Sequence, residues 1–354
     1  MNMIKKFTRR KNAFFRSIKL HLINRRYRHK AARESFQPHR IKNILLLRLD
    51  DKIGDMVITT GCARALAEKG YRVSVLTGPL CKQILSGSEY LENIHLHRPR
   101  MALDELKTAQ FDAVIDFDDV VSYERFKLHA DLGVPCVIGF NKDNYKLFDQ
   151  SIPFFDENKH VTERYKAVLN LFGIADAQYH YHVPFNQQEH DKLQRLLGDK
   201  TDDTRYVAIN PFTGSEDKDF SREQVVTLID ALHSLPFPVK VIMIGQSAKI
   251  ASLALENVVV VENSTINSAV EIVRCSDLVI TPDTSIVHIS RALDKPLIAV
   301  YNKRKLKDTG LPGYKIWAPN YAKAQQIICD TDFISAMPVN DLVQAVKQRL
   351  SDLQ

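Results

Sequence analysis

The sequence predicts an α/β protein made of two Rossmann-like halves in series, on three observations. Short, nearly continuous apolar runs alternate with longer segments of helical periodicity, which is typical of parallel sheets covered by helices on both faces. The alternation begins near residue 41, is interrupted by a polar stretch at about 174–203, and then begins again. The length of 354 residues agrees with two domains of roughly 150 residues each.

The first half is expected to open with a buried strand over 43–49 and a helix over 56–69, which Gly70 ends. A helix over 161–172 closes it. The elements expected between them are strands over 71–77, 111–117 and 135–140 and helices over 103–108 and 123–131. Apolar strands separated by helices in this way predict a parallel sheet.

The second half is expected to open with a strand over 206–210 and a helix over 222–234, for which Ser221 can serve as the N-cap. The remaining elements are strands over 240–244, 258–261, 278–281 and 297–301 and helices over 266–275, 286–293 and 342–353. The predicted organisation is an arm over 1–40, a first Rossmann-like half over 41–175, a linker over 176–203 and a second Rossmann-like half over 204–354. Ligands of open α/β sheets bind at the carboxyl ends of the strands, so the loops that leave the strands are the place to look for chemistry.

Charge is distributed very unevenly along the chain. Residues 1–40 hold thirteen lysines and arginines and a single acid, Glu34, for a net charge of +12. Because the whole chain carries +7, residues 41–354 carry −5. A mildly acidic body therefore follows a strongly basic arm.

The basic arm has a helical pattern of apolar residues, since Phe14, Ile18 and Leu22 recur every four positions. A basic helix with such a face suits an anionic membrane surface, where each lysine or arginine contributes about 1 kcal/mol. Two other interpretations remain open. The helix could pack on its own domain with its charges in solvent, or the arm could bind nucleic acid.

Composition excludes several classes of protein. With 45% hydrophobic and 26% charged residues, the chain has the profile of an ordinary globular protein. It has no apolar run of about 18 residues and no signal-peptide pattern, so we expect it on the cytosolic side. Its five cysteines are odd in number and include no CxxC pair, which predicts reduced thiols and neither a disulfide framework nor a zinc site.

The loop after the first strand places three carboxylates and a lysine at a strand's carboxyl end: Asp50, Asp51, Lys52 and Asp55. Gly54 permits a tight turn or a close approach of backbone. Asp55 stands at the start of a helix, where a carboxylate can cap free N–H groups. Because it also faces the predicted crevice, it could instead act as a general base.

Two loops of the second half suit an anionic ligand. In the first, Thr213, Gly214 and Ser215 offer hydroxyl and amide donors and Lys218 adds a mobile charge, although most such runs are simple turns.

The other loop, over 281–288, opens a helix that Asp283 or Thr284 can cap, with free N–H groups at its start. His288 lies one turn into that helix. It is either structural or a hydrogen-bond donor near a diphosphate.

Taken together, these loops resemble those of the ADP-heptose–lipopolysaccharide heptosyltransferases, glycosyltransferase family 9. The N-terminal pattern of the family is matched by 44–49 (ILLLRL), 54–60 (GDMVITT) and 64–66 (RAL), and its C-terminal pattern by 281–288 (TPDTSIVH) and 292–296 (ALDKP). Residues 210–220 and 160–173 are also similar to family segments, so the resemblance covers about 41–301.

The resemblance implies a GT-B fold, with two Rossmann-like domains whose parallel sheets face a central cleft. It implies an inverting, metal-independent transfer of heptose from ADP-heptose to a lipid-linked acceptor, the lipopolysaccharide core or a lipid A precursor. The sugar nucleotide would be a co-substrate, and no cofactor is expected. The enzyme would work in the cytoplasm, peripherally on the inner membrane through the basic arm, with no nucleic-acid partner.

The resemblance also implies roles for individual residues. Asp55 would be the catalytic base, and Lys218 with the loop at Thr213 and Gly214 would hold the diphosphate and stabilise the leaving ADP. Asp283 would bind hydroxyls of the donor sugar. The helix start at Thr284 and Ser285, together with His288, would contact diphosphate or sugar. The acceptor would meet the loop that contains Asp51, Lys52 and Gly54.

Two departures from the family pattern matter. Asp50, Asp51 and Lys52 replace residues that are often serines, which affects acceptor recognition, and Ser285 replaces a glycine beside the donor. The alternatives are therefore a glycosyltransferase or an epimerase that uses another nucleotide sugar, or a non-catalytic protein that binds membrane or nucleic acid.

Overall fold

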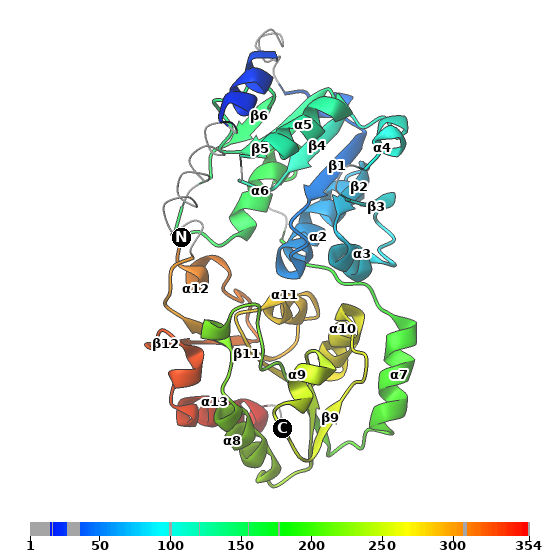
Figure 1. Cartoon of the computed structure of the whole chain (residues 1–354). Coiled ribbons are helices and arrows are strands. Elements are labelled where there is room, and N and C mark those ends of the chain that lie inside the picture. The colour runs from blue at the N-terminus through cyan, green and yellow to red at the C-terminus, as the bar shows by residue number, and fades with distance from the viewer. Residues whose placement is uncertain are drawn as a thin grey trace.

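The computed structural model consists of two α/β halves, one stacked on the other (Figure 1). Each half contains one six-stranded sheet in which every pair of neighbouring strands is parallel. The predicted fold class, α/β with two Rossmann-like parallel sheets, is confirmed. The structure describes residues 15, 17–26, 36–98, 101–119, 121–154, 156–175, 178–306 and 310–352.

The first sheet has the strand order β3-β2-β1-β4-β5-β6. Its strands are β1 (Asn43–Arg48), β2 (Arg72–Thr77), β3 (Asn93–Leu96), β4 (Ala113–Asp116), β5 (Cys136–Phe140) and β6 (Gln150–Ile152). Every residue of β1 and β4 is buried, which explains why both read as continuous apolar runs. The short edge strands β3 and β6 were not predicted, because three or four partly exposed residues carry no clear period.

The helices of the first half are α2 (Ile53–Glu68), α3 (Pro79–Leu85), α4 (Asp104–Thr108), α5 (Tyr123–Leu132) and α6 (Thr162–Leu171), with a 3₁₀ turn at Pro38–Arg40. Helix α2 begins three residues earlier than predicted. Asp55 therefore lies within its first turn, and it does not precede the helix as a cap.

The second sheet repeats the topology of the first, in the order β12-β11-β10-β7-β8-β9. Its strands are β7 (Arg205–Ile209), β8 (Val239–Met243), β9 (Val258–Val260), β10 (Leu278–Pro282), β11 (Leu297–Asn302) and β12 (Ala324–Cys329). In both sheets the strand order reverses between the first and fourth strands, β1 and β4 or β7 and β10. Such a switch point is where ligands bind in open α/β folds.

The helices of the second half are α8 (Arg222–His233), α9 (Ser247–Ala251), α10 (Ile266–Cys275), α11 (Ser285–Ala292), α12 (Gly313–Ile316) and α13 (Val339–Ser351), with 3₁₀ turns η2 (Glu216–Lys218) and η3 (Ile334–Ala336). The predicted N-cap of α8 is confirmed. Ser221 accepts from the amide of Gln224, whose side chain accepts in turn from the Ser221 amide, a full capping box.

The polar stretch predicted as a linker contains a helix, α7 (Gln187–Leu197), which runs beside the second half (Figure 1). Its buried residues are Leu193 and Leu197, and it packs against α10. The proposed limits of the two domains, at 175 and 204, remain a prediction, and the segment between them is a packed element as well as a connection.

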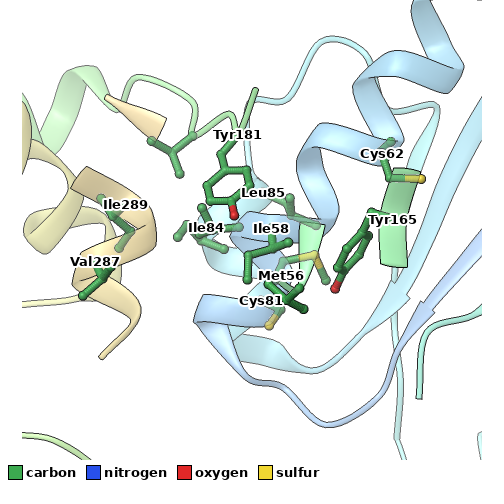
Figure 2. Packing of buried hydrophobic residues seen from close by; sticks show 14 of the residues in the cluster. Met56, Ile58, Cys62, Cys81, Ile84, Leu85, Tyr165, Tyr181, Val287 and Ile289 are labelled. Atoms are coloured by element: carbon green, nitrogen blue, oxygen red, sulfur yellow. The ribbon is translucent and has the colours of Figure 1, made fainter. Parts of the chain in front are cut away.

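The two halves meet through helices. Helices α2 and α3 of the first half contact α11 and α10 of the second, and one apolar cluster runs through all of them. Figure 2 shows Ile58 and Ile84 on the side that faces Val287 and Ile289 across this junction. The cleft between the sheets is therefore closed on one side by a continuous core.

The arm contributes a helix over residues 17–26 that packs on its own half. Leu20 and Ile23 contact a buried cluster that includes Phe126 and Phe148, and the Asn24 side chain hydrogen-bonds to the backbone of Asn144 and Lys146. Ile18 and Leu22, in contrast, are 40% and 57% exposed. Phe14 lies outside the described residues, so the predicted face is seen only in part.

Two further expectations concerned disulfide bonds and membrane-spanning helices. All five cysteines are free thiols in the structure. Among the described residues, none of the helices has the length and apolar character that a membrane span requires.

Candidate active site

The switch points of the two sheets place four loops around one cleft. The loop after β1 leads into α2, and residues 117–119 follow β4. From the other half, the loop after β7 contains η2, and β10 leads into α11. Since parallel strands end at the same edge of a sheet, each pair of loops lies side by side.

These loops enclose a cavity of about 610 Å³. From the first half it is lined by Arg48, Asp50, Lys52, Gly54, Asp55, Phe117, Asp118, Asp119, Val161, Arg164 and Tyr165, and from the second by Lys218, Asp283, Thr284, Ser285, His288, Leu306 and Trp317. The structure thus brings together most of the predicted site residues of both halves.

Asp55 is held by one group from each half. Its Oδ2 lies 3.0 Å from Nη2 of Arg48, a buried residue at the end of β1. Its Oδ1 accepts a hydrogen bond from the indole Nε1 of Trp317 at 3.4 Å. No side-chain cap bond is made at the start of α2, so the capping role considered for Asp55 does not apply.

The surroundings keep Asp55 ionised. Burial opposes the charge, but the neighbouring cations Arg48 and Lys52 and the hydrogen bond from Trp317 outweigh it and lower the pKa of Asp55. Burial has the opposite result at Asp50, whose pKa is raised. The Asp55 side chain is 16% exposed, and a carboxylate that stays charged beside an open cavity can accept a proton from a bound hydroxyl.

Across the cavity, Lys218 and Asp283 form an ion pair, with Nζ 2.5 Å from Oδ2. Lys218 ends η2 and Asp283 follows β10, so the pair joins the two loops of the second half. Burial raises the pKa of Asp283, although the charge of Lys218 opposes the shift.

Helix α11 begins at the cavity wall. Thr284 is its N-cap, and its side chain accepts from the amide of Ile286. The Thr284 hydroxyl is also hydrogen-bonded to Asn210 and Thr281. With Ser285 at the first helical position, the positive end of the helix points at the space where an anion could bind.

His288 lies one turn along α11 and is only 3% exposed. Burial lowers its pKa to about 3, helped by His160 and Arg291, so the ring is neutral at physiological pH. In the part of the chain that the structure describes, its buried Nδ1 has no hydrogen-bond partner.

A second cavity of about 580 Å³ adjoins the first. It is lined by Ile53, Leu80, Gln83, Asn210, Phe212, Thr213, Gly214, Ile244, Gly245, Gln246, Ser264, Thr265, Ile266, Ala269, Ile272, Asp283, Thr284, Ser285 and Ile286. Asp283, Thr284 and Ser285 line both cavities. Thr213 and Gly214, predicted as donor-binding, belong to this second space, whose mixed apolar and polar lining suits a nucleoside.

Asp51, which was predicted to lie on the acceptor side of the site, is instead hydrogen-bonded to the start of α3. The carboxylate of Asp51 lines neither cavity and accepts hydrogen bonds from the amides of Leu80 and Cys81 at 3.2 and 2.8 Å. It thereby satisfies the free N–H groups at the start of α3. The structure therefore does not support Asp51 as a residue that faces an acceptor.

Sequence reasoning missed several cavity residues. Arg164 pairs with Asp119, at 2.6 Å, and Lys142, which is fully buried, donates to the carbonyl oxygens of Asp118 and Asp119. These contacts fix the loop after β4. No local pattern indicated them, because each joins segments far apart in the chain.

Arg48 and Trp317 were also missed as site residues. Arg48 lies within the N-terminal motif, but only the fold shows that it faces Asp55. Trp317 is the single tryptophan of the chain, which was the one available signal. Among the described residues, no three His, Cys, Asp or Glu side chains converge as metal ligands would.

A comparison with protein families matches residues 100–333 to the model described as glycosyltransferase family 9 (heptosyltransferase). The matched range covers well over half of the chain. It includes Lys218, Asp283 and His288 and begins after Asp55.

Individual proteins are similar over most of the chain. "Putative lipopolysaccharide heptosyltransferase 4" of Escherichia coli (strain K12) is 24% identical over 97% of both chains. A family 9 glycosyl transferase of Veillonella parvula has the same fold, with a TM-score of 0.75 at 15% identity over 88% of this chain and 97% of that one. E. coli ADP-heptose lps heptosyltransferase II gives a TM-score of 0.68 at 15% identity, over 88% and 99%.

Proposed function

The chain belongs to glycosyltransferase family 9 (heptosyltransferase), and on that premise we propose that it transfers heptose from ADP-heptose to the lipopolysaccharide inner core, with inversion at the anomeric carbon. The similar proteins named for lipopolysaccharide and for ADP-heptose support both substrates. The observation that carries the proposal is one cavity with an ionised Asp55 on one wall and Lys218, Asp283 and the start of α11 on the other.

In the proposed reaction, Asp55 takes the proton of an acceptor hydroxyl while the hydroxyl oxygen attacks the anomeric carbon. The bond from that carbon to the diphosphate oxygen breaks, and ADP leaves with the electron pair. Attack from the face opposite the leaving group inverts the configuration. Lys218 and the positive end of α11 stabilise the negative charge that develops on the diphosphate.

The donor would extend across both cavities. Its nucleoside would occupy the second cavity, near Thr213 and Gly214, and its diphosphate would lie at the three residues that both cavities share. When Lys218 turns to the diphosphate, Asp283 is released to accept hydrogen bonds from sugar hydroxyls. Ser285, where the family commonly has glycine, adds a hydroxyl at this point.

The acceptor would enter from the first half, past Lys52 and the loop after β4 that carries Asp118 and Asp119. Gly54 lets the first turn of α2 lie close against His288, which brings Asp55 to the wall of the cavity where the acceptor would bind. No step in this scheme uses a metal ion. Transfer rates measured with and without EDTA would test that part of the proposal.

We also propose that the arm binds the cytoplasmic face of the inner membrane. The exposed side chains of Ile18 and Leu22 accompany the basic residues Lys19, Arg25 and Arg26, a combination that suits an anionic lipid surface. Leu20 and Ile23 hold the helix on the protein, so membrane contact would orient the body above the lipid-linked acceptor.

The first test is calorimetric titration of the protein with ADP, UDP and GDP. Preferential binding of ADP, weakened by Asp283→Ala or Lys218→Ala, is expected, followed by transfer of heptose to a lipopolysaccharide-core acceptor. A preference for UDP or GDP would overturn the heptose donor. Conversion of the sugar nucleotide without an acceptor would indicate an epimerase, and no nucleotide binding would favour a non-catalytic protein.

A further inference from the structure

Trp317 is the only tryptophan of the chain, and its indole N–H reaches into the opposite half to bond Asp55. It follows α12 directly, in the second half, whereas Asp55 lies in the first turn of α2. The two residues are 262 positions apart in the sequence. The contact can form only when the two halves stand as they do in this structure.

The backbone on both sides of Trp317 is fixed to the first half. Ile316 O accepts from the amide of Val161 at 3.0 Å. Ala318 O accepts from Nε2 of His160 at 2.9 Å. On the side of its own half, Tyr301 OH donates to Trp317 O at 2.7 Å. Residues 316–318 therefore form a strap that joins the two halves. The indole of Trp317 lies between the two backbone hydrogen bonds that hold the strap to the first half.

Among the described residues, each oxygen of the Asp55 carboxylate has one donor. Arg48 of the same half contacts Oδ2, and Trp317 of the other half donates to Oδ1. A carboxylate oxygen has two lone pairs, so an acceptor hydroxyl can still bind. Arg48 alone would leave the carboxylate free to rotate about its single contact. The second donor sets its plane.

We propose that Trp317 is a positioning residue that orients the Asp55 carboxylate, so that the base is ready for the reaction only when the two halves are together. This inference rests on the proposed function of Asp55. It explains why Trp317, from the half that would bind the donor, contacts Asp55, which would act on the acceptor. The donor would bind mainly to the second half. By holding that half against the first, it would also orient the Asp55 carboxylate for the reaction.

The kinetic test compares Trp317→Phe with wild type. Phe keeps an aromatic ring and removes the N–H, so kcat should fall about tenfold while the donor KM stays within about twofold. The acid limb of the kcat profile should also move to higher pH, because the charged carboxylate has lost a donor. Trp317→His, which restores an N–H, should recover part of kcat. Lys315→Ala, in α12 beside the strap, removes a side chain that contacts Asn158 of the first half and not Asp55. It is the matched control and should behave as wild type.

A second measurement needs no substrate. With one tryptophan, the ¹H–¹⁵N spectrum contains one indole resonance, and Asp55→Asn should shift it clearly. Asp50→Asn removes a carboxylate from the same cavity that does not contact the indole, and should move the resonance much less.

The outcomes separate the inference from the proposed function. If wild-type enzyme transfers nothing from ADP-heptose, the proposed function fails, and the indole resonance still decides whether the contact exists. An indole resonance insensitive to Asp55→Asn would overturn the inference. So would a Trp317→Phe variant with lower kcat but an unmoved acid limb and no recovery in Trp317→His, since that result would indicate a structural role alone.

Discussion

Gly54 and His288 lie against each other where the two halves of the protein meet. A Cβ atom at Gly54 would stand 3.0 Å from Cδ2 of His288, closer than side chains normally pack. The first turns of α2 and α11 thus approach at a point where a side chain would intrude, and this close approach brings Asp55 next to the wall formed by the second half.

Gly54→Ala tests the importance of that approach. Alanine favours the helix by about 1 kcal/mol over glycine, but its methyl group crowds the His288 ring. We expect a melting temperature close to wild type and a kcat/KM lower by about tenfold, because the halves are held slightly apart. A variant with full activity would show that the ring moves aside at no cost to the reaction.

Asp55→Asn should abolish most transfer while it preserves nucleotide binding. A general base contributes about 100-fold to 10,000-fold to rate, so kcat should fall by at least about 100-fold. Asp55 does not line the second cavity, and calorimetry should therefore give an ADP affinity within about threefold of wild type. Normal turnover of the variant would rule out Asp55 as the base.

Lys218→Ala and Asp283→Asn should have different effects on ligands. Removal of Lys218 takes a positive charge from the proposed diphosphate site, so ADP affinity should fall about tenfold or more. Asp283→Asn should weaken the sugar nucleotide more than ADP itself, if the carboxylate binds sugar hydroxyls. An equal loss of affinity for ADP and for the sugar nucleotide would contradict the assignment of Asp283 to the sugar.

The histidines between the halves should make the protein sensitive to acid. Burial lowers the pKa of His160 to about 4 and that of His288 to about 3, from 6.5 in an exposed chain. Between pH 6.5 and 4 the unfolded chain binds more protons than the folded one, so stability is fully present above pH 6.5 and is lost as the pH falls.

The melting temperature should therefore drop by several degrees between pH 7.5 and 4.5. The fall should be shallower in His160→Gln, which removes one titrating group from the interface. His39→Gln, at an exposed site, is the control and should keep the wild-type slope. Identical slopes for all three proteins would mean that His160 is not responsible.

The exposed arm residues should govern binding to lipid. Ile18→Glu combined with Leu22→Glu should reduce co-sedimentation with anionic vesicles about tenfold or more, and leave the melting temperature unchanged because both side chains are already exposed. Phe333→Glu, at a side chain 47% exposed on the second half, is the matched control. Binding that survives the double change, or that nucleic acid displaces, would contradict the membrane assignment.

The central strands and their loops could be predicted from the sequence because their signals are local. Strand β1 is buried at every position and reads as an unbroken apolar run, and Ser221 as a candidate N-cap indicates where α8 begins. The edge strands β3, β6 and β12 gave no such signal, since edge positions are partly exposed and their residues mix polar with apolar.

The sequence by itself determined the α/β class, the repeat of two halves and the loops that hold Asp55, Lys218 and Asp283. The class and the repeat follow from the spacing of apolar residues along the sequence. The loops follow from the rule that ligands of parallel sheets bind at the carboxyl ends of the strands. Only the tertiary structure decided that Asp51 caps α3 and that Trp317 reaches Asp55. Those contacts join residues 30 and 262 positions apart, and no local pattern of hydrophobicity or turn residues specifies a partner at such a distance.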